Sequence, residues 1–227
     1  MPVVLGSAPL VGRADVAASK AARWRPMKNR SRGFTLMELM VTLSVAAIIL
    51  GLAAPSFDEF RRNNRLTSTA NDLLTAIQMA RTEAIKQQQS VSICPTADAT
   101  VATPDCANAE FSSWVMFLDP NNNCVREAGE TVLKKGGPAP TGVVSKRNAG
   151  GLCISFAPTG FLQPQAVTTV VPATNILYCD SRGLAPIAGT QSAGRGVYIT
   201  NTGRSRVARE TSGGGIDDLS TWGFVCP

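Results

Sequence analysis

The chain has 227 residues, which is enough for one ordinary domain with a buried core and additional segments. Its net charge of +6 is typical of a nucleic-acid-binding protein. However, residues 1–33 hold seven of the 22 basic side chains and one of the 16 acidic ones. The rest of the chain is therefore neutral. The chain contains no histidine, no G-x-S-x-G elbow and no Walker loop, so we expect neither an enzyme nor a bound cofactor.

A long apolar segment follows the basic N-terminal residues. Residues 34–54 are interrupted only by Thr35, Glu38, Thr42, Ser44 and Gly51. At about 1.5 Å per helical residue this segment is roughly 30 Å long, the thickness of a bilayer's hydrocarbon core. We predict a single transmembrane helix over residues 34–55 in the inner membrane. Because basic flanks are retained inside, the N-terminus is expected in the cytoplasm and the C-terminal domain in the periplasm.

One carboxylate, Glu38, lies near the start of this apolar segment, where an unpaired charge is costly. A plain signal-anchor would leave Glu38 without a partner. A secretory signal peptide cut near GLAAPS would have an apolar region of about 7–15 residues and no acid. A cut between Gly33 and Phe34 instead creates an α-amine four residues before Glu38, on the same helix face. That amine and the helix N-terminus can balance the carboxylate, within one subunit or between neighbours.

The stretch RGFTLMELMVTLSVAAIILGLAAPSF resembles a type IV prepilin signal, which pilins share with the pseudopilins of type II secretion. The resemblance implies that a prepilin peptidase removes residues 1–33 by cutting after Gly33, and that Phe34 becomes the N-methylated first residue. It also implies that Glu38 acts in assembly and that Pro55 marks a bend in the helix. The leader is longer than is common in the family, so Met27 is an alternative start that leaves the cleavage unchanged.

Residues 56–90 contain neither glycine nor proline and continue as an amphipathic helix. Its apolar side chains recur mostly three or four residues apart: Phe57, Phe60, Leu66, Ala70, Leu73, Leu74, Ile77, Ala80, Ala84 and Ile85. We predict that this stripe packs under a sheet. Arg61, Arg62 and Arg65 are expected to face water or lipid headgroups rather than a ligand.

Residues 91–227 are expected to form a β-rich periplasmic domain. Short β-like runs cover residues 90–94, 113–119, 130–135, 142–146, 152–162, 175–180 and 195–207. The sequences APTG at residues 157–160 and NTG at residues 201–203 are typical of hairpin turns. One long helix followed only by strands predicts an α+β fold, in which the helix packs on an antiparallel β-sheet.

Six cysteines, an even number in a domain expected in an oxidising compartment, predict disulfides. Without a C-x-x-C pair or a histidine, neither a zinc site nor a catalytic cysteine is expected. Six cysteines allow fifteen connectivities. The short loop favours Cys94 with Cys106. Cys179 with Cys226 would fix the C-terminus, and Cys124 with Cys153 follows only by elimination.

The stretch DPNNNCVREAGE has the spacing of a calcium-binding loop. Asp119, Asn121, Asn123 and Glu130 occupy positions 1, 3, 5 and 12 of an EF-hand-like pattern. However, Cys124 takes the position that requires glycine, and both flanks are predicted strands. We therefore favour an Asn-rich hairpin loop and predict no metal site.

A local group of arginines, Arg204, Arg206 and Arg209 with Arg195 upstream, stands out in the otherwise neutral part of the chain. In a strand, Arg204 and Arg206 would point to the same face, and arginine suits phosphate because its guanidinium donates two parallel hydrogen bonds. The alternative is an edge strand kept soluble by its charge. No aromatic side chains suitable for stacking on bases are evident beside these arginines in the sequence.

Six further pieces resemble, in chain order, the GspH/FimT branch of minor pilins and pseudopilins: ARTEAIKQQQSVSICP, WVMFLDPNNN, GETVL, ISFAPTGF, YCDSRG and ITNTGRSRV. The branch packs an N-terminal helix on an antiparallel sheet, and its members occur at low copy near filament tips. Members linked to competence carry a Gly-Arg-x-Arg stretch that contacts DNA, which Gly203, Arg204 and Arg206 match.

Two functions follow from this resemblance. The first is a FimT-like minor pilin that helps to initiate a pilus and contacts incoming double-stranded DNA through the arginines. The second is the minor pseudopilin H of a type II secretion pseudopilus. In either case the expected partners are the prepilin peptidase, other minor and major pilins or pseudopilins, and the inner membrane.

Overall fold

A computed structural model describes residues 33–107, 109–148, 152–164, 174–184, 192–209, 222–224 and 226. The predicted leader, up to residue 32, lies outside the described residues, as do the side chains of residues 53–55. The chain divides into two compact units, Met1–Ile49 and Leu50–Pro227.

One long helix, α1, spans Leu36–Gln87. Thr35 caps its start: the Glu38 backbone N–H donates to Thr35 Oγ1 at 3.1 Å, and the Leu39 N–H donates to the Thr35 carbonyl at 3.1 Å. At the other end, Gln88 adopts a left-handed φ of 54°, and its side-chain amide donates to the Ile85 carbonyl at 2.6 Å. Both ends of α1 therefore have partners for backbone groups that the helix itself leaves unpaired.

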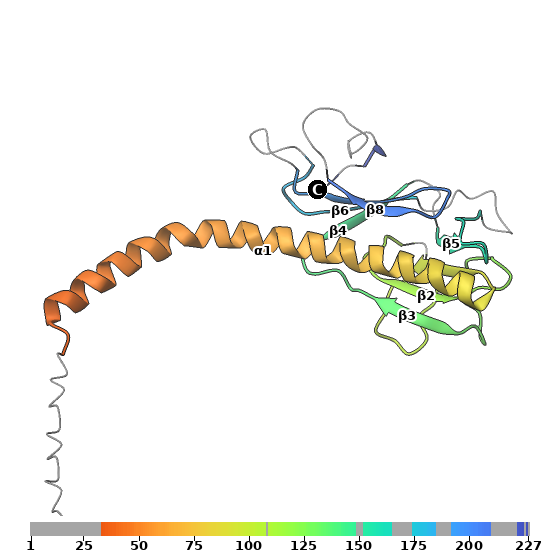
Figure 1. The fold of residues 1–227 in the computed structure, drawn as a ribbon, viewed down its shortest axis with the longest axis horizontal. Helices are drawn as coiled ribbons and strands as arrows, with labels where there is room; N and C mark the ends of the chain where they lie inside the picture. The colour runs from red at the N-terminus through yellow and green to blue at the C-terminus, as the bar shows by residue number, and fades with distance from the viewer. Residues whose placement is uncertain are drawn as a thin grey trace, which may run out of the picture. The chain divides into compact units, whose positions relative to one another are not determined.

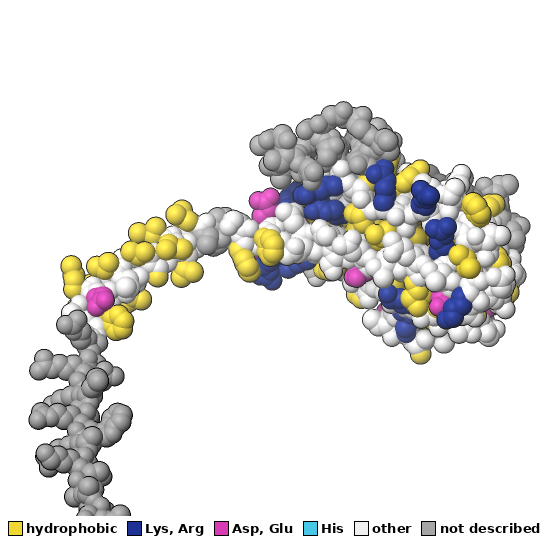
Figure 2. All heavy atoms as spheres, in the orientation of Figure 1, with side chains coloured by type: hydrophobic (Ala, Val, Ile, Leu, Met, Phe, Trp, Pro, Cys, Tyr) yellow, Lys and Arg dark blue, Asp and Glu magenta, His cyan; other side chains and the backbone are white. Residues whose placement is uncertain are grey.

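The described residues of the first unit form an apolar helix whose side chains are exposed (Figure 2). Its hydroxyl groups turn back to the helix backbone, with Thr42 donating to the Leu39 carbonyl at 2.9 Å and Ser44 donating to the Met40 carbonyl at 2.8 Å. Among the described residues, no single straight helix has the length and composition to cross a membrane, whereas the bent pair Leu36–Leu52 and Ser56–Gln87 does. In the sequence Pro55 lies between these two segments, and the bend at this residue stays a prediction.

Eight strands follow α1 in the second unit: β1 Val91–Pro95, β2 Trp114–Leu118, β3 Val132–Gly136, β4 Val144–Arg147, β5 Ile154–Phe156, β6 Asn175–Cys179, β7 Arg195–Ile199 and β8 Ser205–Ala208. They form two four-stranded sheets, in the orders β3-β2-β1-β5 and β4-β6-β7-β8, and all their pairings are antiparallel. The C-terminal half of α1 lies against both sheets (Figure 1). The predicted helix on an antiparallel sheet is confirmed, but the division into two sheets was not predicted.

The main core joins α1 to both sheets. The buried side chains of α1 are Leu66, Ala70, Leu73, Ala76, Ile77, Ala80 and Ala84. They pack with alternate residues of the strands, such as Val91 and Ile93 of β1 and Val197 and Ile199 of β7. The predicted stripe is thus correct from Leu66 to Ala84, with Leu74 only partly buried.

At its two ends the predicted stripe is wrong. Phe57, Phe60 and Ile85 are 58%, 58% and 44% exposed, so they do not belong to this core. The helix extends beyond the sheets at its start, and the sheets therefore offer Phe57 and Phe60 no surface to pack on. These two rings instead lie next to each other, with centroids 6.4 Å apart.

The outer face of each sheet carries its own small apolar cluster with disulfides. On the first sheet, Val115 and Phe117 pack with the bonded pairs Cys94–Cys106 and Cys124–Cys153. On the second sheet, Leu177 and Ala208 pack with the pair Cys179–Cys226. The structure thus contains the pairs Cys94–Cys106 and Cys179–Cys226 that the sequence favoured, and the pair Cys124–Cys153 that had followed only by elimination.

All described core residues lie after residue 65, and all six cysteines lie after residue 90. A fragment that starts at Ser56 therefore contains every described core residue and all six cysteines. Because it lacks the apolar segment, this fragment is the one used in the experiments below.

Candidate functional site

Three places in the chain carry the predicted functional residues: the start of α1, the loop after β2, and strands β7 and β8. At the start of α1, Phe34 is 81% exposed and Glu38 is exposed. A side chain added at Gly33 would meet no atom within 4 Å, so packing does not require glycine there. Thr35 caps the helix by accepting from the Glu38 backbone N–H, a contact that the sequence-based interpretation missed.

The loop after β2 is folded by its own hydrogen bonds. The Asp119 carboxylate is fully buried: its Oδ2 accepts from the Ser92 hydroxyl at 2.6 Å and from the Cys124 N–H at 3.1 Å, while its Oδ1 accepts from the Asn123 N–H at 3.1 Å. The Glu130 carboxylate accepts from the Glu127 N–H at 2.8 Å. Oxygens that a calcium ion would need are thus engaged in holding the loop.

The surroundings of Glu130 shift the pKa of its carboxyl group. Its partial burial and the negative charges of Asp119 and Glu127 raise the pKa of the Glu130 carboxyl above its usual value, against hydrogen bonding from Glu127 and the charge of Arg126. No group of three or more His, Cys, Asp or Glu side chains within the described ranges has a metal-binding arrangement. The Asn-rich hairpin loop is therefore the interpretation that the geometry supports.

The predicted arginine group divides between the two faces of the second sheet. In the β7–β8 register, Tyr198 pairs with Arg206 and Gly196 pairs with Ala208. Because successive side chains point to opposite faces, Arg206 lies on the outer face and Arg195 on the inner face. Arg204 and Arg206 are exposed, whereas Arg209 is half-buried and donates from Nε to the Ser192 carbonyl at 3.2 Å.

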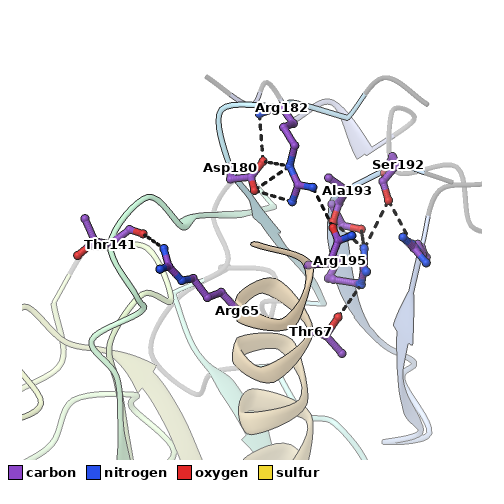
Figure 3. A network of polar contacts seen from close by, with 11 residues as sticks. Arg65, Thr67, Thr141, Asp180, Arg182, Ser192, Ala193 and Arg195 are labelled. Atoms are coloured by element: carbon purple, nitrogen blue, oxygen red, sulfur yellow. Dashed lines mark hydrogen bonds and ion pairs between the residues drawn. The ribbon is translucent and has the colours of Figure 1, made fainter. Parts of the chain in front are cut away.

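Arg195 belongs to the interior, which corrects its assignment to a DNA-binding surface. Its side chain points toward α1, where its Nε donates to Thr67 Oγ1 at 3.2 Å (Figure 3). Its Nη1 donates to the carbonyls of Ala193 and Gly194, at 2.6 and 3.0 Å. Burial, together with the positive charges of Arg209 and Arg182, lowers the pKa of Arg195 to about 10, so the guanidinium remains charged at neutral pH. Arg195 therefore fastens β7 to α1.

A second polar contact fastens β6 to the helix. Arg182 makes a bidentate pair with Asp180, with Nη2 2.7 Å from Oδ2 (Figure 3). Its Nη1 donates to Asn63 Oδ1 on α1 at 2.9 Å. Burial acts to raise the pKa of Asp180. Hydrogen bonds from Arg182 and the positive charges of Arg182 and Arg62 outweigh that effect, so the pKa lies below its usual value.

The arginines at the start of the amphipathic half of α1 are exposed, as predicted. Arg62 and Arg65 line a shallow pocket of about 200 Å³ with Asp180 and the residues that follow Pro140. Arg65 reaches the Thr141 carbonyl at 3.5 Å (Figure 3). Because Arg182 already pairs with Asp180, this pocket has an excess of positive charge.

The outer face of the second sheet also carries aromatic rings that the sequence-based interpretation did not find. The Arg206 guanidinium carbon lies 5.8 Å from the centre of the Tyr198 ring. The Tyr198 and Trp222 ring centroids are 6.3 Å apart, and Trp222 meets Phe224 edge-on at 6.1 Å. Trp222 and Phe224 are near the C-terminus, so only the folded chain brings them beside Arg206. Figure 2 shows further Lys and Arg side chains spread over the visible face of this unit.

Removing the Arg195 side chain should destabilise the domain. Arg195→Ala leaves a cavity and several buried acceptors without a donor, so we expect the free energy of unfolding of the Ser56 fragment to fall by about 2–4 kcal/mol. Arg206→Ala, at an exposed position, should cost at most about 1 kcal/mol. Urea unfolding followed by circular dichroism measures both, and equal losses would contradict the different placement of the two arginines.

The Asp180–Arg182 pair should make stability depend on pH. Because the pKa of Asp180 is lowered by folding, the pair stabilises the domain above about pH 4 and loses this contribution as the pH falls below that value. Asp180→Asn should therefore lower the free energy of unfolding by about 1–3 kcal/mol at neutral pH and by progressively less below about pH 4. Asp58→Asn, at an exposed position of α1, is the control. If the difference in the free energy of unfolding between Asp180→Asn and the unaltered fragment stayed constant down to about pH 2, it would contradict the role of the carboxylate charge.

Comparison with known proteins relates most of the chain to filament subunits. The pattern of the family described as "Type II transport protein GspH" matches residues 69–207, and that of the "Prokaryotic N-terminal methylation motif" matches residues 28–54. The pilin-like protein PilA1 of Thermus thermophilus is 27% identical over 181 residues, which covers 78% of this chain and 97% of PilA1.

Two further similarities extend this comparison. The type IV narrow pilus major component PilA5 of Thermus thermophilus is 28% identical over 116 residues, covering 49% of this chain and 94% of PilA5. The crystal structure of the type IV minor pilin FimU of Pseudomonas aeruginosa covers 70% of this chain and 99% of FimU, with 20% identity and a TM-score of 0.44.

Proposed function

Because the chain belongs to the GspH family, whose pattern spans residues 69–207, we propose that it is a minor type IV pilin that is assembled at low copy into a pilus and helps to initiate it. The observation that carries this proposal is the methylation motif over residues 28–54, which precedes the GspH region. That motif implies a membrane-anchored pilus component, and proteins of this family are structural subunits rather than enzymes.

The first step of the proposed function is maturation. A prepilin peptidase cuts after Gly33, and Phe34 becomes the methylated N-terminus. The open space around Gly33 and the exposure of Phe34 support access by such an enzyme. Residues 34–55 then hold the protein in the inner membrane, with residues 56–227 in the periplasm.

The second step is assembly with other pilins. The exposed Glu38 carboxylate needs a cationic partner in the membrane, and the amine of Phe34 in a neighbouring subunit supplies one. The capping contact from Thr35 uses the backbone N–H of Glu38, so it leaves that carboxylate available for the neighbour.

A finer part of the proposal is contact with double-stranded DNA through Arg204 and Arg206. Both are exposed and belong to or precede β8, which is an edge strand. Arg209 can contribute only from a half-buried position, and Arg195 not at all. Two or three arginines would give weak, salt-sensitive binding without sequence preference.

The alternative is the minor pseudopilin H of a type II secretion system, in which this chain would be a subunit of the secretion pseudopilus. The description of the matching family as a type II transport protein favours it. The names of the two Thermus relatives, a pilin-like protein and a pilus component, favour the pilus instead. Inspection of neighbouring genes separates the two: secretion genes support the alternative, and minor pilin genes support the pilus.

Assembly should depend on Glu38 but not on another exposed carboxylate of α1. We expect mass spectrometry of the protein from its own cells to show N-methylated Phe34 as the first residue. Glu38→Val should still be cleaved but should be lost from sheared filaments, because its charge no longer pairs with the neighbouring amine. Glu59→Val, which removes another exposed carboxylate of α1, should be retained. Normal incorporation of Glu38→Val would contradict the proposed role, and an unprocessed N-terminus would contradict the maturation step.

DNA contact should depend on the outer arginines of the second sheet. In Arg204→Gln/Arg206→Gln, the affinity of the Ser56 fragment for duplex DNA should fall about tenfold at low salt, and the salt slope should fall by about 2. Arg62→Gln/Arg65→Gln changes the net charge equally on α1 and should bind almost normally. Fluorescence anisotropy at several salt concentrations measures both variants. Equal losses would show that binding depends only on net charge, and no binding by the unaltered fragment would contradict DNA contact.

A further inference from the structure

The aromatic rings on the outer face of the second sheet form a continuous group beside the exposed arginines. Tyr198 lies under the Arg206 guanidinium, Trp222 lies next to Tyr198, and Phe224 supports Trp222 edge-on. Each of the three rings keeps part of its surface exposed. We call Tyr198, Trp222 and Phe224 the aromatic platform.

The platform depends on contacts between distant parts of the chain. The Cys179–Cys226 disulfide ties the end of the chain to β6 across a sequence separation of 47 residues. Trp222 and Phe224 then pack against Leu177 and Ala208 on the outer face of the sheet. Tyr198 comes from β7, directly opposite Arg206 of β8 in the register. Three separate segments thus place planar apolar rings next to the exposed guanidinium of Arg206, and Arg204 is exposed two residues before it.

This combination has a recognised chemistry. Arginines contact phosphates, and aromatic rings stack on bases whose faces are open. In a duplex the base faces are hidden by their neighbours, so a duplex can use the arginines but gains little from the rings. A single strand can use both.

We propose that this face of the second sheet binds single-stranded DNA, with unpaired bases stacked on Tyr198 and Trp222 and phosphates held by Arg204 and Arg206. The inference rests on the proposed DNA contact and deepens it, because it adds the aromatic platform and a preference for unpaired bases. An aromatic cluster that only anchors the C-terminus would instead be indifferent to the nucleic acid.

Tryptophan fluorescence gives a direct readout of this site. The chain has three tryptophans, and Trp24 is absent from a fragment that starts at Ser56. Trp114 is only 4% exposed, under the Lys134 side chain, so a change on ligand binding reports on Trp222. We would titrate the disulfide-bonded fragment with a short oligothymidine and, separately, with its duplex with oligoadenine.

We expect the single strand to quench the fluorescence and to bind about tenfold more tightly than the duplex, in line with the contribution of one stacked base. Trp222→Ala should lower the affinity for the single strand about tenfold and leave duplex binding almost unchanged. Trp222→Phe keeps a ring and should retain most of the affinity. Phe60→Ala removes an exposed ring on α1 and serves as the matched control.

The outcomes separate the inference from the proposed function. If duplex binding depends on Arg204 and Arg206 but the single strand neither binds more tightly nor quenches the fluorescence, the aromatic platform is overturned and DNA contact stands. If neither nucleic acid binds, both fail. If Trp222→Ala does not fold, Trp222→Phe still tests the proposal. Because phenylalanine also stacks on bases, a folded Trp222→Phe variant that no longer binds the single strand would overturn stacking as the source of the affinity.

Discussion

The seven buried side chains of α1 between Leu66 and Ala84 form the surface on which both sheets pack. Four of the seven are alanines, which let strands approach the helix closely, while Leu66, Leu73 and Ile77 fill the space between them. Because the strand pairings link each sheet only internally, the two sheets are held in common by this helix face. A change of period in this stripe would therefore affect both halves of the domain at once.

The polar contacts between the second sheet and α1 follow from the same packing. Arg195 and Arg182 reach from β7 and from the turn after β6 to Thr67 and Asn63, one turn apart on the helix. A buried guanidinium is costly unless its donors are satisfied, and here backbone carbonyls and the Asp180 carboxylate supply acceptors. These contacts fix the side of α1 that the second sheet covers.

The outer faces of the sheets obey a different constraint. In each sheet, every second side chain points away from α1, and its apolar surface must be shielded from water by another segment. The described part of the chain provides no second helix for this purpose. Short segments tethered by disulfides take that role, through Cys106 and Cys124 on one sheet and Cys226 on the other. Disulfides persist in an oxidising compartment, which is where the proposed function places this domain. On the second sheet the same tether brings Trp222 to Arg206, so the cover is also the proposed binding surface.

Several features of this protein were determined by the sequence itself. The prepilin-like start, the helix period from Leu66 to Ala84, the positions of the strands and the favoured Cys94–Cys106 pair depend on local pattern or spacing, which a linear sequence contains. The Cys124–Cys153 pair had followed only by elimination. The limits of the apolar stripe were not predictable, because Phe57 and Ile85 keep the period but lie where the sheets end. Only the tertiary structure decided that the strands divide into two sheets, since pairing depends on long-range contacts. The tertiary structure also separated the four arginines. Because successive side chains of β7 and β8 point to opposite faces of the sheet, Arg195 points toward the helix and Arg206 toward solvent. The rings beside Arg206 come from distant segments, and no spacing in the sequence brings them together.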